Sequence, residues 1–185
     1  EWAVQRSEVR TRIAEAMERA DYNKPTAALE TTTRFLAAPT DVNWGGKAHG
    51  GRVMNWIDDA AYLCGTRWSA GEVATAYMGG VRFYRPIHIG QVVELSARLI
   101  HTGRQTMHIA VHVRAYWPKD GRETARLAAH SLTVLAALDD AGDATAVAEW
   151  APQLRGDVDL DLHARELIDI RGRRDPAQAH RMVAI

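Results

Sequence analysis

The sequence predicts an α+β fold in which a curved antiparallel sheet of about five strands wraps around one central helix. Residues 50–68 form a helical pattern that is apolar on nearly every side, so other parts of a protein must surround it. Four strand-like segments follow, and consecutive strands joined by tight turns form antiparallel sheets. The 185 residues, 46% of them hydrophobic, are enough for one domain with its own core.

The central helix is predicted from hydrophobic periodicity. One stripe follows steps of three, four and three residues, and further apolar residues lie on the other sides. The stripe consists of Met54, Ile57, Ala61 and Cys64, and the other apolar positions are Val53, Trp56, Ala60 and Leu63. We therefore expect the helix to be buried all round.

The strands are predicted from alternating and β-branched segments between turn residues. The expected strands are 30–37 before the helix and 72–84, 91–101, 105–117 and 123–138 after it. Within residues 105–117, every second residue from Met107 to Ala115 faces one side of the strand, and every second residue from His108 to Tyr116 faces the other side. The pair Gly79-Gly80 indicates a bulge or a close backbone approach. We expect a second subunit to cover the remaining sheet surface and the edges.

Helical segments are predicted on both sides of this central region. Residues 7–20 are amphipathic with Ser7 as N-cap, and residues 157–170 form a second candidate helix. The chain thus divides into an N-terminal helix and linker (1–28), a central domain (29–138) and a C-terminal tail with a helix (139–185).

Composition excludes several classes of function. The 23 basic and 23 acidic side chains give zero formal charge, which argues against general nucleic-acid and membrane-surface binding but leaves a local basic patch open. The single cysteine, Cys64, cannot form an internal disulfide, and no Cys/His spacing suggests zinc. No apolar run approaches the roughly 20 residues of a membrane span, and no signal peptide is recognisable. We expect a reducing, cytoplasmic compartment.

The start of the central helix has the chemistry of an anion-binding site. Its first N–H groups lack intrahelical partners, and Gly50 and Gly51 have no side chains to keep an oxygen atom away. Such groups can form an oxyanion hole, or the glycines can simply make a tight turn. His49 directly precedes them and could bind a substrate or orient the loop.

Two carboxylates, Asp58 and Asp59, interrupt the apolar helix. Ionised carboxylates are rarely buried without a partner, so each is either paired to the sheet or functional. Asn43 in the preceding loop could hold a water or a carbonyl, or serve as an ordinary turn residue. Thr75 could support a carboxylate, although threonine is also common in strands.

Taken together, these residues resemble the hotdog-fold acyl-CoA thioesterases. The matching pieces, in order, are N-x6-GG from Asn43 to Gly51, VM-x3-D ending at Asp58, Thr75, F-x2-P-x3-G from Phe83 to Gly90, and GRQTM from Gly103 to Met107. The resemblance runs from about Arg34 to Leu138, which is most of the central domain. It implies a hotdog fold and a thioester hydrolase.

Two branches of that family contribute to the resemblance. The VM-x3-D helix and the later Gly-Arg turn look like the long-chain and broad-range acyl-CoA hydrolases. The His-Gly-Gly of residues 49–51 looks more like the phenylacetate-type thioesterases. Many relatives carry an aspartate in the strand after Thr75 where this chain has Gly79, so the resemblance does not fix the shape of the pocket.

The resemblance also implies a mechanism and roles for individual residues. Asp58 would act as general base or nucleophile, supplied by the partner subunit of a dimer. The N–H of Gly51, joined by Gly50, would bind the thioester oxygen, with His49 orienting the thioester. Asn43 and Thr75 would complete the catalytic set. Coenzyme A would lie on the subunit seam, near the turn formed by Gly103, Arg104, Gln105 and Thr106.

No metal or separate cofactor is implied, since coenzyme A is part of the substrate. The assembly would be a homodimer at minimum, or a trimer of dimers as in the acyl-CoA hydrolase branch. Asp59 matches no functional position of the family.

Three alternative functions stay open: a catalytically inactive hotdog acyl-CoA-binding protein, a hotdog enoyl-CoA hydratase, and an acyl-CoA sensor that represses transcription. The sensor would need a DNA-binding helix-turn-helix, which has two helices, whereas this sequence predicts a single N-terminal helix.

Overall fold

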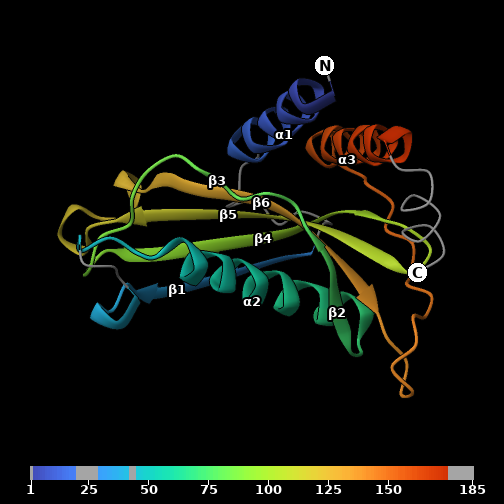
Figure 1. Cartoon of the computed structure of the whole chain (residues 1–185), viewed down its shortest axis with the longest axis horizontal. Helices are drawn as coiled ribbons and strands as arrows, with labels where there is room; N and C mark the ends of the chain where they lie inside the picture. The colour runs from blue at the N-terminus through green and yellow to red at the C-terminus, as the bar shows by residue number, and fades with distance from the viewer. Residues whose placement is uncertain (1, 20–28, 42–44, 175–185) are drawn as a thin grey trace.

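The computed structural model describes residues 2–19, 29–41 and 45–174. One antiparallel sheet carries a long helix on one face and two helices on the other (Figure 1). The elements in chain order are α1 (Trp2–Arg19), β1 (Glu30–Leu36), α2 (Gly50–Ser69), β2 (Val73–Met78), β3 (Arg82–Phe83), β4 (Val92–Thr102), β5 (Thr106–Tyr116), β6 (Arg126–Ala137) and α3 (Arg155–Arg174). Short 3-10 turns lie at Pro39–Asp41, Pro118–Asp120 and Arg122–Thr124.

The sheet has six strands in the order β1-β4-β5-β6-β2, with β3 pairing separately with β6. The extra strand arises because the predicted strand 72–84 is divided into β2 and β3. Between them, the Gly79 N–H donates to the Leu132 carbonyl at 2.7 Å, and the Ser131 hydroxyl donates to the Gly79 carbonyl at 3.0 Å. The irregularity in the ladder lies between Thr75 and Tyr77, earlier than the Gly79-Gly80 pair that predicted it.

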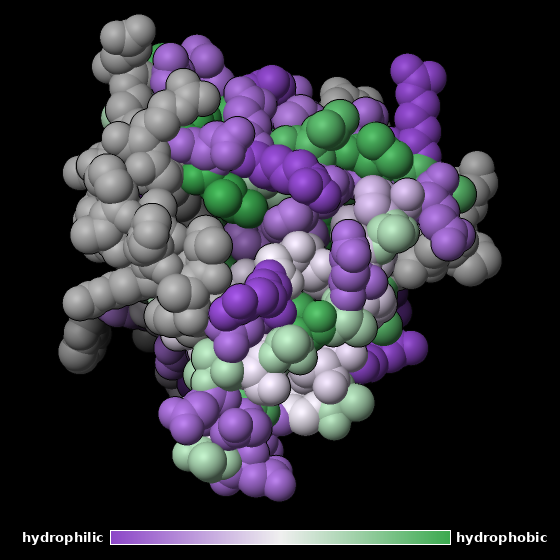
Figure 2. All heavy atoms as spheres, turned by 90° about the vertical axis from the view of Figure 1, so that its right-hand side faces the viewer, coloured by the Kyte–Doolittle hydropathy of each residue, from purple (hydrophilic) through white to green (hydrophobic). Residues whose placement is uncertain are grey.

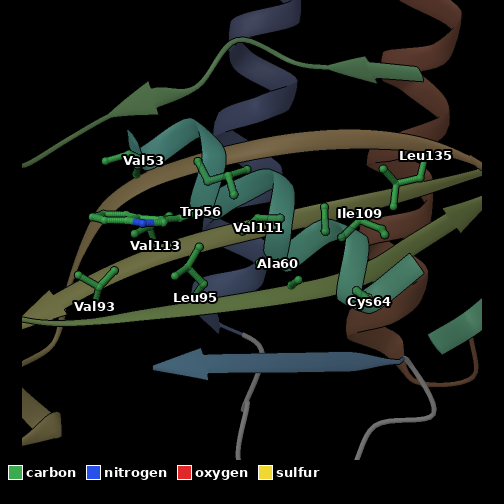
Figure 3. Close-up of a cluster of buried hydrophobic side chains, with 14 of the residues drawn as sticks. Val53, Trp56, Ala60, Cys64, Val93, Leu95, Ile109, Val111, Val113 and Leu135 are labelled. Atoms are coloured by element: carbon green, nitrogen blue, oxygen red, sulfur yellow. The ribbon is translucent and has the colours of Figure 1, made fainter. Parts of the chain in front are cut away.

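The main core lies between α2 and the sheet (Figure 3). Val53, Trp56, Ala60 and Cys64 point from α2 toward residues of three strands. Those residues are Val93 and Leu95 of β4, Ile109, Val111 and Val113 of β5, and Leu135 of β6. The predicted alternation in β5 is therefore confirmed, and the side from Met107 to Ala115 is the one that faces the main core.

The prediction that α2 is buried all round is wrong for a single chain. Ile57, Ala61 and Cys64 are fully buried, but Met54 is 43% exposed and Leu63 is 47% exposed. The reason is that α2 forms an outer layer, with the sheet covering only one of its faces. Its outward apolar side chains stay exposed to solvent in the isolated chain.

The opposite face of the sheet is covered by α1 and α3 of the same chain, which lie side by side (Figure 1). A second apolar cluster joins the helices to the sheet, formed by Val9, Ile13, Ile100, Ala110, Leu132, Leu160, Ala164, Leu167 and Ile170. The expectation that another subunit covers this surface is thus wrong. Ser7 also lies inside α1 rather than capping it, because the helix already begins at Trp2.

Polar contacts accompany this second cluster. Buried Arg98 of β4 donates a hydrogen bond to buried Asp157 of α3. Nδ1 of His101 lies 2.7 Å from Asp161, which also accepts from Arg165 at 2.7 Å. A buried ion pair stabilises little in net terms, but breaking it leaves a costly unpaired charge. These pairs therefore fix where α3 sits on the sheet.

In the side view of Figure 2, hydrophilic and hydrophobic residues are interspersed over the face shown. None of the helices in the described ranges is both long enough and apolar enough to cross a membrane.

The packing of α2 generates a stability prediction. Ile57→Ala should lower the free energy of unfolding by about 2–5 kcal/mol, because it leaves a cavity in a fully buried site. The matched control, Asn55→Ala at an exposed position of the same helix, should cost less than about 1 kcal/mol. Urea unfolding followed by circular dichroism measures both. Equal losses would contradict the one-sided burial described above.

A pH dependence follows from two histidines whose rings lie 5.0 Å apart between β5 and β6. Burial, reinforced by the charge of Arg10, lowers the pKa of His130 to about 3. Burial, reinforced by His130, lowers the pKa of His112 well below its usual value. Below about pH 6.5 the unfolded chain binds protons at both positions while the native chain does not.

Stability should thus be constant above about pH 6.5 and fall as the pH drops toward 3, by about 1.4 kcal/mol per pH unit for each histidine. Urea unfolding between pH 7.5 and 4.5 measures this slope. The His130→Gln variant removes one of the two protons, so its slope should be shallower. An unchanged slope in that variant would rule out His130 as a source of the pH dependence.

Candidate active site

The start of α2 is capped by His49. This residue has extended backbone angles (φ −68°, ψ 135°), and its Nδ1 accepts a hydrogen bond from the Gly51 N–H at 3.2 Å. The His49 carbonyl accepts from the N–H groups of Arg52 and Val53 at 2.9 and 3.1 Å. The helix thus begins at Gly50, as predicted. The N–H that we expected to bind a thioester oxygen is engaged by the His49 ring in this structure.

The loop before α2 is braced by Asp41, a residue that the sequence did not single out. Its carbonyl accepts from the His49 N–H at 2.9 Å, and its carboxylate accepts from Arg52 at 2.7 Å. The second carboxylate oxygen accepts from the Ala38 N–H at 2.9 Å. In the sequence Asp41 looks like an ordinary turn residue, so the only available signal was its place in a Pro-Thr-Asp turn. Asp41 fixes the angle at which the chain enters α2.

The Phe83–Gly90 motif of the resemblance lies beside the same helix end. The tip of the Phe83 ring is 3.7 Å from the position that a Cβ of Gly50 would occupy. The Ala48 N–H donates to the Ile87 carbonyl at 2.8 Å. The glycines and the aromatic segment, far apart in the sequence, therefore form one surface around the start of α2.

Asp58 and Thr75 form a direct contact. The Thr75 hydroxyl, on β2, donates to Oδ1 of Asp58 at 2.7 Å. Asp58 is half-buried and Thr75 is exposed, so the pair lies at the surface where α2 meets the edge strand. The structure thus contains the hydrogen bond that the resemblance implies, while the catalytic roles of both residues stay predictions.

Asp59 lies on the other flank of α2. It is exposed and lines an open groove of about 310 Å³ between α2 and β1. The groove is also lined by Thr33, Phe35, Trp56, Ala60, Leu63 and Leu95, with Asp41 and Arg52 at the polar end. The rings of Phe35 and Trp56 meet edge to face, with centroids 4.9 Å apart. The two adjacent aspartates therefore serve different surfaces.

Within one chain the glycines and Asp58 are too far apart to share a reacting atom. Gly51 and Asp58 are about two turns apart, which is about 10 Å along the axis of an α-helix. A thioester carbonyl bound at the helix start therefore lies beyond hydrogen-bond reach of Asp58 in the same chain.

The turn predicted to bind coenzyme A lies near the opposite end of α2. Trp68 of α2 donates to the Ala148 carbonyl at 3.0 Å, and the neighbouring Val147 N–H donates to the Arg104 carbonyl at 3.0 Å. The structure does not bring this turn and the His49–Gly51 segment together in one chain. Asn43 lies outside the described residues.

Among the four residues of that turn, the side chain of Arg104 is the exposed one. Gln105 donates from its side chain to the Ala144 carbonyl at 2.7 Å, and Thr106 is 4% exposed. The Gly103 N–H donates to the Thr106 carbonyl at 2.8 Å, which closes the turn. Gln105, Thr106 and Gly103 thus have structural contacts, and their binding roles stay predictions.

Two further kinds of chemistry can be judged from the same residues. Burial raises the pKa of the Cys64 thiol to about 12, so this cysteine stays protonated and is unsuited to nucleophilic attack. Within residues 2–19, 29–41 and 45–174, no three His, Cys, Asp or Glu side chains are grouped as a metal ion would require.

The chain is similar to known thioesterases. Residues 45–120 match the family model described as the thioesterase superfamily. An uncharacterised acyl-CoA thioester hydrolase of Zymomonas mobilis is 34% identical over 94 residues, which are 50% of this chain and 63% of that protein. The chain thus spans less than two thirds of that curated relative.

Solved structures extend the similarity to most of the fold. The crystal structure of an apo-hexameric acyl-CoA thioesterase has a TM-score of 0.75 and 28% identity, covering 82% of this chain and 96% of that one. A Staphylococcus aureus acyl-CoA hydrolase in complex with butyryl coenzyme A, coenzyme A and coenzyme A disulfide has a TM-score of 0.74 and 24% identity, covering 88% and 99%. The predicted hotdog fold is confirmed by these likenesses.

Proposed function

We propose that this protein is an acyl-CoA thioesterase, which hydrolyses an acyl-CoA thioester to a free acid and coenzyme A. The observation that carries the proposal is the Thr75–Asp58 hydrogen bond on the exposed flank of α2. It orients a carboxylate at a surface open to substrate, while the helix start offers N–H groups for an oxyanion. The named relatives, which are acyl-CoA thioester hydrolases, support the same reaction.

In the proposed reaction Asp58 acts on the thioester carbonyl in one of two ways. As a general base it takes a proton from water, which then attacks the carbonyl carbon; as a nucleophile it attacks that carbon itself. Thr75 holds one carboxylate oxygen and leaves the other free to react. Asn43 would position the water or the carboxylate. Collapse of the tetrahedral intermediate then releases the thiol of coenzyme A.

The oxyanion would be bound at the start of α2 by the Gly51 N–H, joined by Gly50. Because His49 Nδ1 accepts from the Gly51 N–H, the substrate oxygen has to replace the imidazole as acceptor. The ring would then turn toward the thioester and orient it, which is the role proposed for His49. The Asp41 brace supports this step, because it holds the backbone of the loop in place while the side chain moves.

The site would be completed by a second copy of the chain. Asp58 and Gly51 of one chain are about 10 Å apart along the helix, so one thioester cannot contact both. If Asp58 of one chain lies next to the helix start of the other chain, one thioester can contact both groups. The exposed apolar side chains of Met54 and Leu63 are consistent with a contact between chains along α2. We propose a homodimer at minimum; two similar structures are of hexameric thioesterases.

The groove between α2 and β1 is the best candidate for the acyl chain. Phe35, Trp56, Leu63 and Leu95 give it an apolar lining beside the central helix. Coenzyme A would follow the subunit seam toward Arg104, whose exposed guanidinium suits its phosphates. We also propose that the protein belongs to the broad-range acyl-CoA hydrolase branch, with a His-Gly-Gly helix start like that of the phenylacetate-type enzymes. We propose a cytoplasmic location as well.

The spacing of the candidate residues gives further support. Three of the similar Staphylococcus aureus structures are alanine variants of that acyl-CoA hydrolase, at one asparagine, one aspartate and one threonine. In that protein the three residues follow one another at the same two intervals as Asn43, Asp58 and Thr75 do here. The coincidence favours these three residues as one catalytic set.

Replacing the proposed base should abolish hydrolysis without unfolding the protein. We expect Asp58→Asn to lower kcat/KM for acyl-CoA at least about 100-fold, because the amide keeps the shape and the Thr75 contact but cannot accept a proton. The matched control is Asp169→Asn, at an exposed position of α3 on the other face of the sheet, which should stay within about twofold of the parent. Release of free thiol, measured from acetyl- to palmitoyl-CoA, follows the reaction. Full activity of a folded Asp58→Asn variant would refute the assignment.

A mixing experiment tests whether the site is shared. Gly51→Pro removes the proposed oxyanion donor in the first turn of α2, where the N–H has no partner within the helix to lose. Asp58→Asn and Gly51→Pro variants should each be inactive alone. After co-refolding in equal amounts, half of the dimers are mixed and each contains one intact site, so activity should return to about a quarter of the parent value. If activity stays absent although mixed dimers form, each site uses residues of one chain.

A further inference from the structure

An open pocket lies on the far side of the sheet from α2, between α1 and the segment that leads into β3. It has a volume of about 310 Å³ and is lined by Ala3, Arg6, Ser7, Arg10, Gly80, Val81 and Arg82. In Figure 1, α1 lies over the sheet next to α3, on the opposite side from α2. The pocket is therefore separate from the candidate active site. Its volume is within the range of small-molecule sites, roughly 300–1,000 Å³.

Three guanidinium groups converge on this pocket. Arg6 and Arg10, one turn apart on α1, both reach toward Gly80: Nη1 of Arg10 is 3.3 Å and Nη2 of Arg6 is 3.9 Å from the position a Gly80 Cβ would occupy. Arg82, two residues further along, lines the same pocket. Because Gly80 has no side chain, the guanidiniums can come close to the backbone.

Arg10 carries an unmet hydrogen-bond donor beside this pocket. None of the described lining residues carries a carboxylate. Nη2 of Arg10 is buried and has no hydrogen-bond partner in the described part of the chain. Burial, with the charges of Arg6 and Arg82, lowers the pKa of Arg10, yet arginine remains charged at neutral pH. A buried donor without an acceptor is costly, so the geometry favours an anion that brings its own oxygens.

Arg82 is held in place before any ligand arrives. Its Nη1 donates a hydrogen bond to the Thr11 hydroxyl, and its Cζ lies 5.8 Å from the centre of the Tyr84 ring. A fixed guanidinium loses less side-chain entropy when a ligand binds. Thr11 and Tyr84 thus prepare one of the three cationic groups for an anion.

We propose that Arg6, Arg10 and Arg82 form a second binding site, which takes the phosphate group of a small phosphorylated molecule. A phosphate monoester has three acceptor oxygens and a charge of about −1.5 to −2 at pH 7, and a diphosphate has more of both, which matches several guanidiniums better than a single carboxylate does. The Ser7 hydroxyl adds one more donor at the rim. The site does not depend on the proposed hydrolase activity, because it shares no residue with the candidate active site.

Titration calorimetry on the purified full chain tests this site with inorganic pyrophosphate, ADP and adenosine. Pyrophosphate and ADP should bind saturably, adenosine should not, and the affinity should fall as potassium chloride is raised. Arg10→Gln should weaken pyrophosphate binding at least tenfold. Arg82→Gln, at an exposed position, should also weaken binding and guards against a folding defect at Arg10. Thermal unfolding verifies that each variant is folded.

The control is Arg104→Gln, the same substitution at the arginine proposed to lie near coenzyme A. It should leave pyrophosphate affinity unchanged. If Arg104→Gln weakens binding while Arg10→Gln and Arg82→Gln do not, the phosphate binds at the coenzyme A site and the proposal fails. The proposal also fails if succinate competes as well as pyrophosphate does, or if the folded parent protein binds no pyrophosphate at millimolar concentration.

Discussion

The packing of one face of α2 against β4, β5 and β6 is the interaction on which the rest of the structure depends. Ile57, Ala61 and Cys64 are fully buried in that contact, so the helix cannot rotate without exposing them. This fixed rotation directs Asp58 toward Thr75 on one flank and Asp59 toward the β1 groove on the other. The hydrophobic contact thereby decides which of two adjacent, chemically identical residues meets an edge strand and which meets a groove.

The second layer follows from the same sheet. Because α2 covers one face, the other face also needs a cover, and α1 and α3 provide it with an apolar cluster centred on Ile13, Leu132 and Leu160. The pairs Arg98–Asp157 and His101–Asp161 then fix the position of α3. Because the chain's own helices cover this face, contacts with other copies are left to α2 and the sheet edges. The same cover forms the arginine-lined pocket beside α1.

Helix geometry makes the proposed active site incomplete in one chain. The oxyanion donors are at the end of α2 and the carboxylate is in its middle, so both cannot touch the same carbonyl. The exposed Met54, one turn from Asp58, and the edge strand β2 belong to the same region of the surface as Asp58. Assembly and catalysis are therefore coupled in this proposal, because the contact that would bury these side chains also brings the two halves of the site together.

The sequence by itself determined the elements whose signals are local. Apolar spacing and the glycine start defined α2 nearly to the residue, and strict alternation separated the two faces of β5. The resemblance to a known family singled out Asp58 and Thr75, whose catalytic roles stay predictions. Tertiary structure decided what local patterns cannot carry: the division of residues 72–84 into two strands, the exposed outer face of α2, the Asp41 brace and the start of α1 before Ser7. The first two depend on partners distant in sequence, which are β6 for residues 72–84 and the sheet for α2. Periodicity shows that a helix has an apolar face, but only the packed sheet determines which apolar residues are covered.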